Sequence, residues 1–340
     1  MITIGIDPHK SSLTAVALTS SGEVAATIRL AVTRDTVARL RAWAGQWDQR
    51  RWAVEGAAGL GRGVAQGLAA GDELVVDVPA QLAARARLLN TGHARKTDSI
   101  DAASVAVVAL HHPRLHPVRA EDHSVVLRLL SGRRDDLAEE RTRTVNRLHA
   151  VLRELIAGGA KRNLSAGQAA ALLRGVRPAT AVDEQRKALA RDLVGDLRRL
   201  DNALQRNATD IASAVAVHRT SVTQVHGIGP VLAAKIIGHS STVARFPTRH
   251  HYASYCGTAP IEASSDEQRR HRLSRAGNRQ LNRALHLVAV CQIRTRGPGR
   301  EFYQRKLAEA KTPAEARRAL KRRLSDTIYR HLVRDQQEAT

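Results

Sequence analysis

The sequence predicts an α/β N-terminal domain with a mixed sheet, followed by an all-α coiled-coil region and a mainly α-helical C-terminal domain. Three observations lead to this prediction. Short apolar runs alternate with helical patterns in residues 1–113, and apolar residues recur at near-heptad spacing in residues 123–215. Helical, strongly basic segments fill residues 216–340. An alternation of strands and helices is typical of α/β architecture.

Strands are expected where short apolar runs are bounded by turn residues. They are Ile2–Ile6, Leu13–Leu18, Val24–Leu30, Trp52–Glu55 and Leu74–Val78. Helices are expected over Thr33–Trp47, Leu60–Ala70, Ala80–Leu89 and Ser99–His111. Three strands, followed by helix, strand, helix, strand and helix, form the order of the ribonuclease-H-like (RuvC-like) fold.

Residues 114–122 are expected to form a linker into a long helical region. Two apolar runs in this region have near-heptad spacing: Leu130, Leu137, Val145, Leu148, Val151, Leu152, Leu155 and Ile156, then Leu189, Leu193, Leu197, Leu200, Leu204 and Ile211. The pattern indicates either an antiparallel hairpin within one chain or a dimer seam between two chains. The predicted division is an α/β domain (1–113), a helical linker and dimerisation region (114–215), a basic helical domain (216–300) and basic C-terminal helices (301–340).

The charge of the chain points to a nucleic-acid partner. The formal net charge is +22, yet residues 1–113 carry 12 Lys/Arg against 10 Asp/Glu, so nearly all the excess lies beyond them. Only 8 of the 54 basic residues are lysine, and arginine grips phosphate bidentately. A GC-rich genome would explain arginine over lysine, but not positive over negative charge. Aromatic residues make up 3%, so base stacking on them is not the expected main binding mode.

The remaining composition limits the setting of the protein. Two cysteines, Cys256 and Cys291, are too few for a disulfide framework or a zinc cluster, and they fit a reducing cytoplasm. No apolar run reaches the roughly 20 residues that span a bilayer, so no membrane partner is expected. We expect a cytoplasmic, nucleoid-associated protein.

Four carboxylates are the first candidate site. Asp7 and Glu55 each end a strand-like run, while Asp98 and Asp101 lie three residues apart at the start of a helical stretch. Such groups can converge on hard divalent cations, including a pair of Mg²⁺ ions, and cations would offset their mutual repulsion. Taken singly, each residue could instead be a helix cap or a surface strand end. Together they predict metal-assisted chemistry on a nucleic-acid phosphate.

A glycine turn is the second candidate site. Gly227 and Gly229 lie between apolar helices, with Lys235 in the helix that follows. This resembles a helix-hairpin-helix, in which backbone N–H groups hold a DNA phosphate. The alternative is an ordinary glycine turn that joins packed helices.

A serine pair, Ser264 and Ser265, precedes a basic segment. A serine beside arginines can be a nucleophile whose target phosphate is held and polarised, although by residue type alone these are more often ordinary loop serines. The candidate nucleic-acid-binding residues of this segment are Arg269, Arg270, Arg272, Arg275, Asn278, Arg279 and Arg283.

The motifs in combination resemble the transposases of the IS-one-ten (IS110) insertion-sequence family. The matching segments run from residue 4 to about residue 290. They are Ile4-Gly-Ile-Asp7-Pro-His-Lys10, Ala53-Val-Glu55, Lys96-Thr-Asp98-Ser-Ile-Asp101, His226-Gly-Ile-Gly-Pro230, Gly257-Thr-Ala-Pro260 with Ser264-Ser265, and Leu273-Ser-Arg-Ala-Gly277-Asn278.

The resemblance implies a RuvC-like domain in which Asp7, Glu55, Asp98 and Asp101 bind Mg²⁺. It also implies a transposase domain, residues 216–300 here, whose serine attacks DNA and forms a phosphoserine intermediate. In the family this serine lies five residues after the proline and is usually followed by glycine. That position is Ser265, followed by Asp266 in place of glycine, and Ser264 is the alternative nucleophile.

The resemblance further implies a structured guide (bridge) RNA, encoded by the element, that pairs with donor and target DNA. Because base pairing then selects sequence, the protein mainly needs charge that binds backbones. Carboxylates and serine fall in different domains, which is consistent with a homodimer or homotetramer. We therefore expect a DNA transposase that acts through Mg²⁺ and a phosphoserine. The alternatives are a RuvC-like hydrolytic nuclease or junction resolvase, and a non-catalytic nucleic-acid-binding protein.

Overall fold

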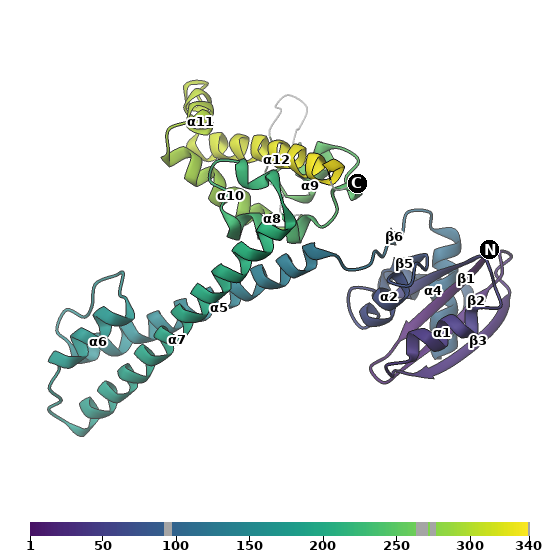
Figure 1. Cartoon of the computed structure of the whole chain (residues 1–340), viewed down its shortest axis with the longest axis horizontal. Coiled ribbons are helices and arrows are strands. Elements are labelled where there is room, and N and C mark those ends of the chain that lie inside the picture. The colour runs from purple at the N-terminus through teal and green to yellow at the C-terminus, as the bar shows by residue number, and fades with distance from the viewer. Residues whose placement is uncertain (92–96, 263–270, 273–276, 339–340) are drawn as a thin grey trace. The chain divides into compact units, whose positions relative to one another are not determined.

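The computed structural model describes residues 1–91, 97–262, 271–272 and 277–338. The chain falls into two units, Met1–Glu121 and Asp122–Thr340, and each is described by itself (Figure 1). The finer division into four parts stays a prediction.

The N-terminal unit contains one six-stranded mixed sheet in the order β3-β2-β1-β4-β5-β6. The strands are β1 (Ile2–Pro8), β2 (Ser12–Leu18), β3 (Val24–Ala31), β4 (Arg50–Glu55), β5 (Val75–Val78) and β6 (His116–Pro117). The first three pair antiparallel, β1, β4 and β5 pair parallel, and β6 is antiparallel to β5. This order confirms the predicted ribonuclease-H-like α/β class. β6 lies inside the segment that was expected to be a linker. The sequence did not predict this strand, because two residues are too few to give a strand pattern.

Burial explains the sheet order. Every residue from Thr3 to Pro8 is buried, as expected for a central strand covered on both faces, whereas β3 is mostly exposed, as expected for an edge. The helices of the unit are α1 (Thr36–Ala44), α2 (Arg62–Ala69), α3 (Ala80–Thr91) and α4 (Asp98–His111). Leu40 of α1 and Leu68 of α2 pack with Ile4 of β1 in one core.

Helix α4 lies unusually close to β1. A side chain at Gly5 would place its Cβ 2.1 Å from the carbonyl oxygen of Ala102 and 2.5 Å from the amide nitrogen of Ala106, so only glycine fits between strand and helix. Thr97 caps α4, because its hydroxyl accepts a hydrogen bond from the Ile100 N–H at 3.3 Å. The close approach brings the acidic first turn of α4 to the end of β1.

The C-terminal unit begins with a helical hairpin. Helices α5 (His123–Leu155) and α7 (Ala181–His218) run side by side, and α6 (Ala166–Gly175) packs at their far end (Figure 1). Leu148, Leu152 and Leu197 are buried there with Leu173 of α6. The heptad pattern therefore forms an intramolecular hairpin, one of the two predicted arrangements.

The rest of this unit is a helical domain built on the base of the hairpin. Its elements are η1 (Ser221–Gln224), α8 (Pro230–Ser240), η2 (Val243–Arg245), α9 (Arg249–Tyr255), β7 (Ile261–Glu262), β8 (His271–Arg272), α10 (Arg279–Arg294), α11 (Pro298–Ala308) and α12 (Pro313–Glu338). One core joins Leu127 of α5 and Ile211 of α7 to Ile236, Leu285 and Leu324. None of the helices in the described ranges is both long and apolar enough to cross a membrane.

Candidate active site

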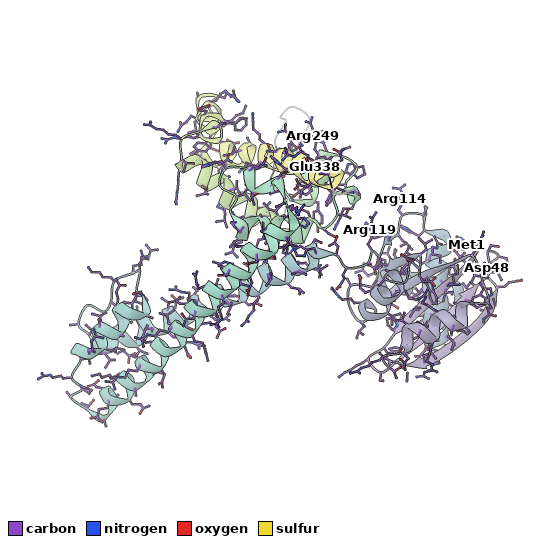
Figure 2. The ribbon with its side chains drawn as sticks, viewed as in Figure 1. Met1, Asp48, Arg114, Arg119, Arg249 and Glu338 are labelled. Atoms are coloured by element: carbon purple, nitrogen blue, oxygen red, sulfur yellow. The ribbon has the colours of Figure 1, made fainter. Side chains whose placement is uncertain are left out.

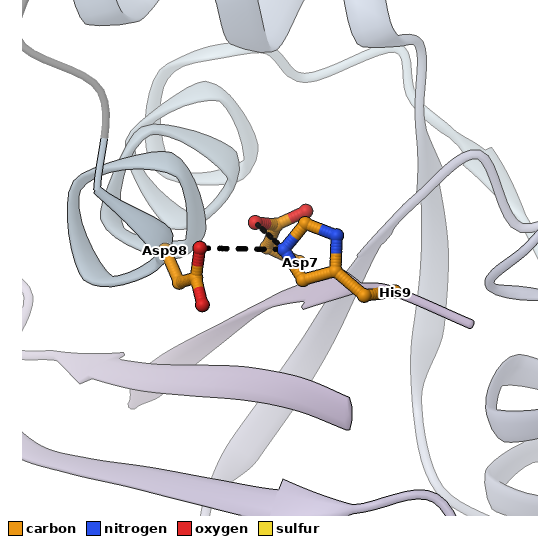
Figure 3. Close-up of side chains that lie close together, drawn as sticks. All are labelled: Asp7, His9 and Asp98. Atoms are coloured by element: carbon orange, nitrogen blue, oxygen red, sulfur yellow. Dashed lines mark ion pairs between the residues drawn. The ribbon is translucent and has the colours of Figure 1, made fainter. Parts of the chain in front are cut away.

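Asp7 lies near the end of the buried strand β1 and is only 7% exposed. His9 follows two residues later, and its Nε2 atom lies 3.3 Å from Asp7 Oδ2 and 3.4 Å from Asp98 Oδ1 (Figure 3). One potential ligand atom from each of the three side chains lies within 4.8 Å of the others. The end of β1 and the start of α4 thus bring together groups that can hold a metal ion.

Glu55 and Asp101 lie near Asp7 as well. Glu55 ends β4, which pairs parallel with β1, so the two carboxylates leave the sheet at the same edge. Asp101 lies one turn beyond Asp98 on α4 and is 8% exposed. Asp7, Glu55 and Asp101 line one hollow of about 100 Å³, whose remaining wall is α3. The four predicted carboxylates therefore lie in one region.

Two arginines and a histidine lie against these carboxylates. Arg87 of α3 donates a 2.6 Å hydrogen bond to Asp101 Oδ1, and Arg29 of β3 lies 3.2 Å from Asp98 Oδ2. His9 bridges Asp7 and Asp98. Clustered carboxylates repel one another, and these contacts reduce the repulsion when no cation is bound.

Sequence reasoning did not select His9, Arg29 or Arg87. Only His9 had a usable signal, since it follows Asp7 by two residues and period-two neighbours share a strand face. The two arginines reach the site through tertiary packing.

The Gly227–Gly229 turn precedes α8 and is partly a packing requirement. Gly227 has φ +85°, and a Cβ there would lie 3.2 Å from the Cys291 sulfur of α10. Gly229 has open space around it and is the N-cap residue of α8, with Pro230 next. The element before the turn, η1, is a single 3-10 turn rather than an α-helix. Gly229 thus leaves the N-terminus of α8 accessible, and phosphate binding there stays a prediction.

Lys235 has a different role from the predicted one. It is 6% exposed, and its Nζ atom donates to both carboxylate oxygens of Asp135 on α5, at 2.7 and 2.6 Å, and to Gln280 Oε1 at 3.1 Å. The apolar surface of α8 draws this lysine into the core, where the carboxylate satisfies it. We correct its assignment from phosphate ligand to structural ion pair.

The other predicted nucleic-acid residues divide into three groups. Asn278 caps α10, since its Oδ1 accepts from the N–H groups of Gln280 and Leu281 at 3.0 and 3.1 Å. Arg279 and Arg283 are exposed on α10. Outside the described residues lie Ser264, Ser265, Arg269, Arg270 and Arg275, and the side chain of Arg272.

The base of the segment that carries the serine pair is firmly held. The two-stranded pair β7–β8 brackets the segment, with Ile261 opposite Arg272. Asn282 of α10 donates to the carbonyl oxygens of Cys256 and Gly257, at 2.9 and 3.0 Å. Lys321 of α12 donates in turn to Asn282 Oδ1 at 2.7 Å.

Burial sets the protonation of two groups at this base. It raises the pKa of the Cys256 thiol to about 12, so the thiol is protonated near neutral pH. Burial is also the main cause that lowers the pKa of Lys321, followed by the charge of Arg317. Cys256 is thus a packing residue rather than a nucleophile.

Two family models match the chain. One, described as "Transposase", matches residues 4–157, and the other, described as "Transposase IS116/IS110/IS902 family", matches residues 219–304. The first range contains all four carboxylates, and the second contains the glycine turn and the serine pair. The chain belongs to the IS110 family of transposases.

Full-length relatives agree with this assignment. The IS110-family chain is 26% identical to "Insertion element IS116 uncharacterized 44.8 kDa protein" of Streptomyces clavuligerus, over 96% of this chain and 94% of that protein. It is 28% identical to "Insertion element IS900 uncharacterized 42 kDa protein" of Mycobacterium paratuberculosis, over 82% and 81%. The resemblance seen in the sequence is confirmed, and as a transposase the protein is a DNA-recombining enzyme.

Solved structures similar to this transposase include two of Thermus thermophilus RuvC, one of them described as a complex with Holliday junction substrate. They are 16% and 14% identical, cover 35% of this chain and 100% and 99% of their own, and have TM-scores of 0.28. Because these scores are low, the fold class rests on the sheet order and the family match.

Proposed function

We propose that this transposase cuts and rejoins donor and target DNA at a site where Asp7, Glu55, Asp98 and Asp101 bind Mg²⁺. The observation that carries the proposal is the convergence of these side chains. Three line one hollow, and the fourth shares His9 with Asp7.

The donor set suits a divalent cation. Carboxylate oxygens are the preferred ligands of Mg²⁺, which usually keeps several waters and completes its shell with substrate phosphate. A hollow of about 100 Å³ has room for such water. When bound, the cation would polarise the scissile phosphate and offset the charge of the transition state. His9 and Arg87 would keep the carboxylates oriented before the cation arrives.

The proposed nucleophile is Ser265, with Ser264 as the alternative. The serine oxygen attacks the scissile phosphorus, a bond between phosphorus and serine oxygen forms, and the bond from phosphorus to the 3′ oxygen breaks. The serine proton passes to water, and the leaving oxygen takes up a proton and departs as a 3′-hydroxyl. A 3′-hydroxyl of the partner strand then attacks the phosphoserine, which regenerates the serine. The number of phosphoester bonds is unchanged, so no ATP is consumed.

The anchored base of the serine segment supports this role, because a nucleophile must be held in position. Asn282 holds the backbone at Cys256 and Gly257, which precede this segment in the chain. The exposed Arg279 and Arg283 follow it on α10 and are suited to hold phosphates near the reaction.

The proposed partners are the element's structured guide RNA and further copies of this chain, in a homodimer or a homotetramer. The charge beyond residue 113 supports backbone binding. The hairpin uses most of its heptad residues within the chain, but Val182 and Leu189, seven residues apart on α7, are 57% and 48% exposed. Exposed apolar residues at this spacing suit a contact between copies. A cytoplasmic, nucleoid-associated location stays a prediction.

Covalent trapping tests the nucleophile. The full chain is mixed with Mg²⁺, the element's flanking RNA and labelled donor-junction DNA, then denatured, and label on protein is measured. We expect a retained band that is lost in Ser265→Ala and kept in Ser264→Ala. The reverse result would move the nucleophile to Ser264.

The same experiment separates the alternatives. Cleaved DNA without a retained band, unaffected by Ser265→Ala, would show a hydrolytic nuclease that uses water. Tight binding without cleavage, insensitive to Mg²⁺ and to Asp7→Asn, would show a binding protein.

A further inference from the structure

Three surface hollows of the C-terminal unit meet at one residue of α12, Thr327. The largest extends toward α10 and α11, the second along α12 past Arg334, and the third toward Arg249 of α9. Figure 2 labels Arg249 beside α12. The continuous depression is here named the α12 groove, and its main residues are Arg249, Arg323, Thr327, Arg330, His331 and Arg334.

Among the described residues, the lining of the groove carries an excess of positive charge. Arg323, Thr327, Arg330 and Arg334 recur at three- and four-residue spacing and so share one face of α12. Within the described part of the chain, Arg323 and Arg330 form no ion pair, and Arg334 has only Glu338 at 3.7 Å. Side chains with this spacing and charge suit a row of phosphates.

One of these arginines is already oriented. The Arg323 guanidinium lies 5.0 Å from the centre of the Phe302 ring of α11, within the range of a cation–π contact. A guanidinium held on a ring loses less rotamer entropy when it binds phosphate. Asp326, the acidic residue at the groove wall, is neutralised by its ion pair with Arg322.

The largest hollow has the size and lining of a nucleotide pocket. Its volume is about 530 Å³, within the range of small-molecule sites. Leu320 and Leu324 give it an apolar wall, Gln292 and Thr295 supply amide and hydroxyl groups, and Arg296 and Arg323 stand at its lining. An apolar surface with a few hydrogen-bonding groups suits a base, and the arginines suit its phosphate.

We propose that the α12 groove binds an unpaired segment of RNA, with its phosphates along the arginines and one base in the hollow beside Thr327. A base within a duplex cannot enter such a hollow without the cost of unpairing, whereas bases in RNA loops are already splayed out. The choice of RNA rests on the proposed function, which supplies a structured guide RNA. The largest hollow borders the glycine turn, because Gln224, Val225 and His226 belong to its lining.

The test is equilibrium binding of fluorescent oligouridine to the full chain at several salt concentrations. We expect Arg323→Gln/Arg330→Gln to weaken binding and to reduce the slope of log affinity against log salt by about 1.4, or about 0.7 for each lost phosphate contact. Arg318→Gln is the matched control, because Arg318 is an exposed α12 arginine that lines none of the three hollows.

A second variant tests the base pocket separately. Thr327→Tyr fills the hollow without changing charge, so we expect affinity to fall about tenfold with the salt slope unchanged. Melting temperatures of all variants should match the wild type, since the changed side chains are exposed or half-buried.

Four outcomes would overturn the inference. An equal loss of affinity in the Arg318→Gln control and in the double variant would show diffuse electrostatic binding. Tighter binding of oligothymidine DNA than of oligouridine would assign the groove to single-stranded DNA. Strong RNA binding with the same affinity in every groove variant would show that the groove is not the RNA site, and the proposed function would be unaffected. Absence of oligouridine binding by the wild type would refute the groove, while the covalent trapping experiment would still decide the proposed function.

Discussion

The ion pair of Lys235 and Asp135 gives a sharp energetic prediction, because its two partners are buried to different degrees. It fastens α8 to α5, with Nζ to Oδ distances of 2.6 and 2.7 Å. The lysine side chain is 7% exposed and the aspartate side chain 29%. We consider the substitutions Asp135→Leu and Lys235→Met and their combination.

The exposed fractions set the order of the costs. Asp135→Leu leaves the nearly inaccessible ammonium of Lys235 without its carboxylate and with Gln280 as its remaining acceptor. We therefore expect the free energy of unfolding to fall by about 3–5 kcal/mol. Lys235→Met leaves a carboxylate that water reaches, so about 1–3 kcal/mol is expected. The double variant removes both charges and should lie within about 1 kcal/mol of the wild type, because paired apolar replacements are often neutral.

The chain offers an internal control for the assay. Its three tryptophans, Trp43, Trp47 and Trp52, all lie in the N-terminal unit, whereas the long helices lie in the C-terminal unit. Urea unfolding followed by far-UV circular dichroism therefore reports mainly the C-terminal unit, and tryptophan fluorescence reports the N-terminal one. We expect the substitutions to move the dichroism midpoint and to leave the fluorescence midpoint in place.

Two results would refute this reasoning. A larger cost for Lys235→Met than for Asp135→Leu would mean that burial does not control the energetics of the pair. A double variant that folds normally but binds nucleic acid with a reduced salt slope would restore Lys235 as a phosphate ligand.

Metal binding, acid sensitivity and thiol reactivity provide further tests. Mg²⁺ at about ten times its dissociation constant should stabilise the N-terminal unit by about 1.4 kcal/mol, or about 5 °C in melting temperature by tryptophan fluorescence. Asp7→Asn should abolish this rise in melting temperature. Glu23→Gln, which changes an exposed carboxylate elsewhere in the unit, should keep it. An equal rise in both variants would exclude the proposed metal site. Burial, and then the neighbouring His123, lower the pKa of His218 below its ordinary 6.5. The unfolded chain therefore binds this proton more readily, so the C-terminal unit should lose stability as pH falls below about 6.5, and His218→Gln should flatten the loss; identical pH slopes would contradict this. The Cys256 thiol, with its pKa raised to about 12, should react with iodoacetamide only after unfolding. Detection of labelled Cys256 in the native protein by mass spectrometry would contradict this.

The sequence was sufficient for the fold class and for the candidate carboxylates, for a physical reason. Strand and helix patterns are local, and Asp7 and Glu55 end apolar runs that become neighbouring parallel strands. Asp98 and Asp101 follow a helix start that the Thr97 cap fixes locally. Convergence at one sheet edge then follows from topology.

The environment of these groups depended on tertiary packing and could not be predicted. Arg87 reaches Asp101 from α3, a contact that no periodicity encodes. Lys235 looked like a phosphate ligand because it follows a glycine turn, yet its neighbours on α8 are apolar and draw it into the core. The heptad pattern allowed hairpin and dimer alike, because the same apolar stripe serves both.

The most direct test of the metal-dependent transposase site is the rate of donor-strand cleavage against Mg²⁺ concentration. The full chain would be assayed with the element's RNA and junction DNA, alongside Asp7→Asn and the control Glu23→Gln. We predict that cleavage saturates with Mg²⁺, disappears in EDTA, falls by about 10²-fold or more in Asp7→Asn and is unchanged in Glu23→Gln. Cleavage at the wild-type rate in EDTA, or by Asp7→Asn, would contradict a catalytic role for the four carboxylates.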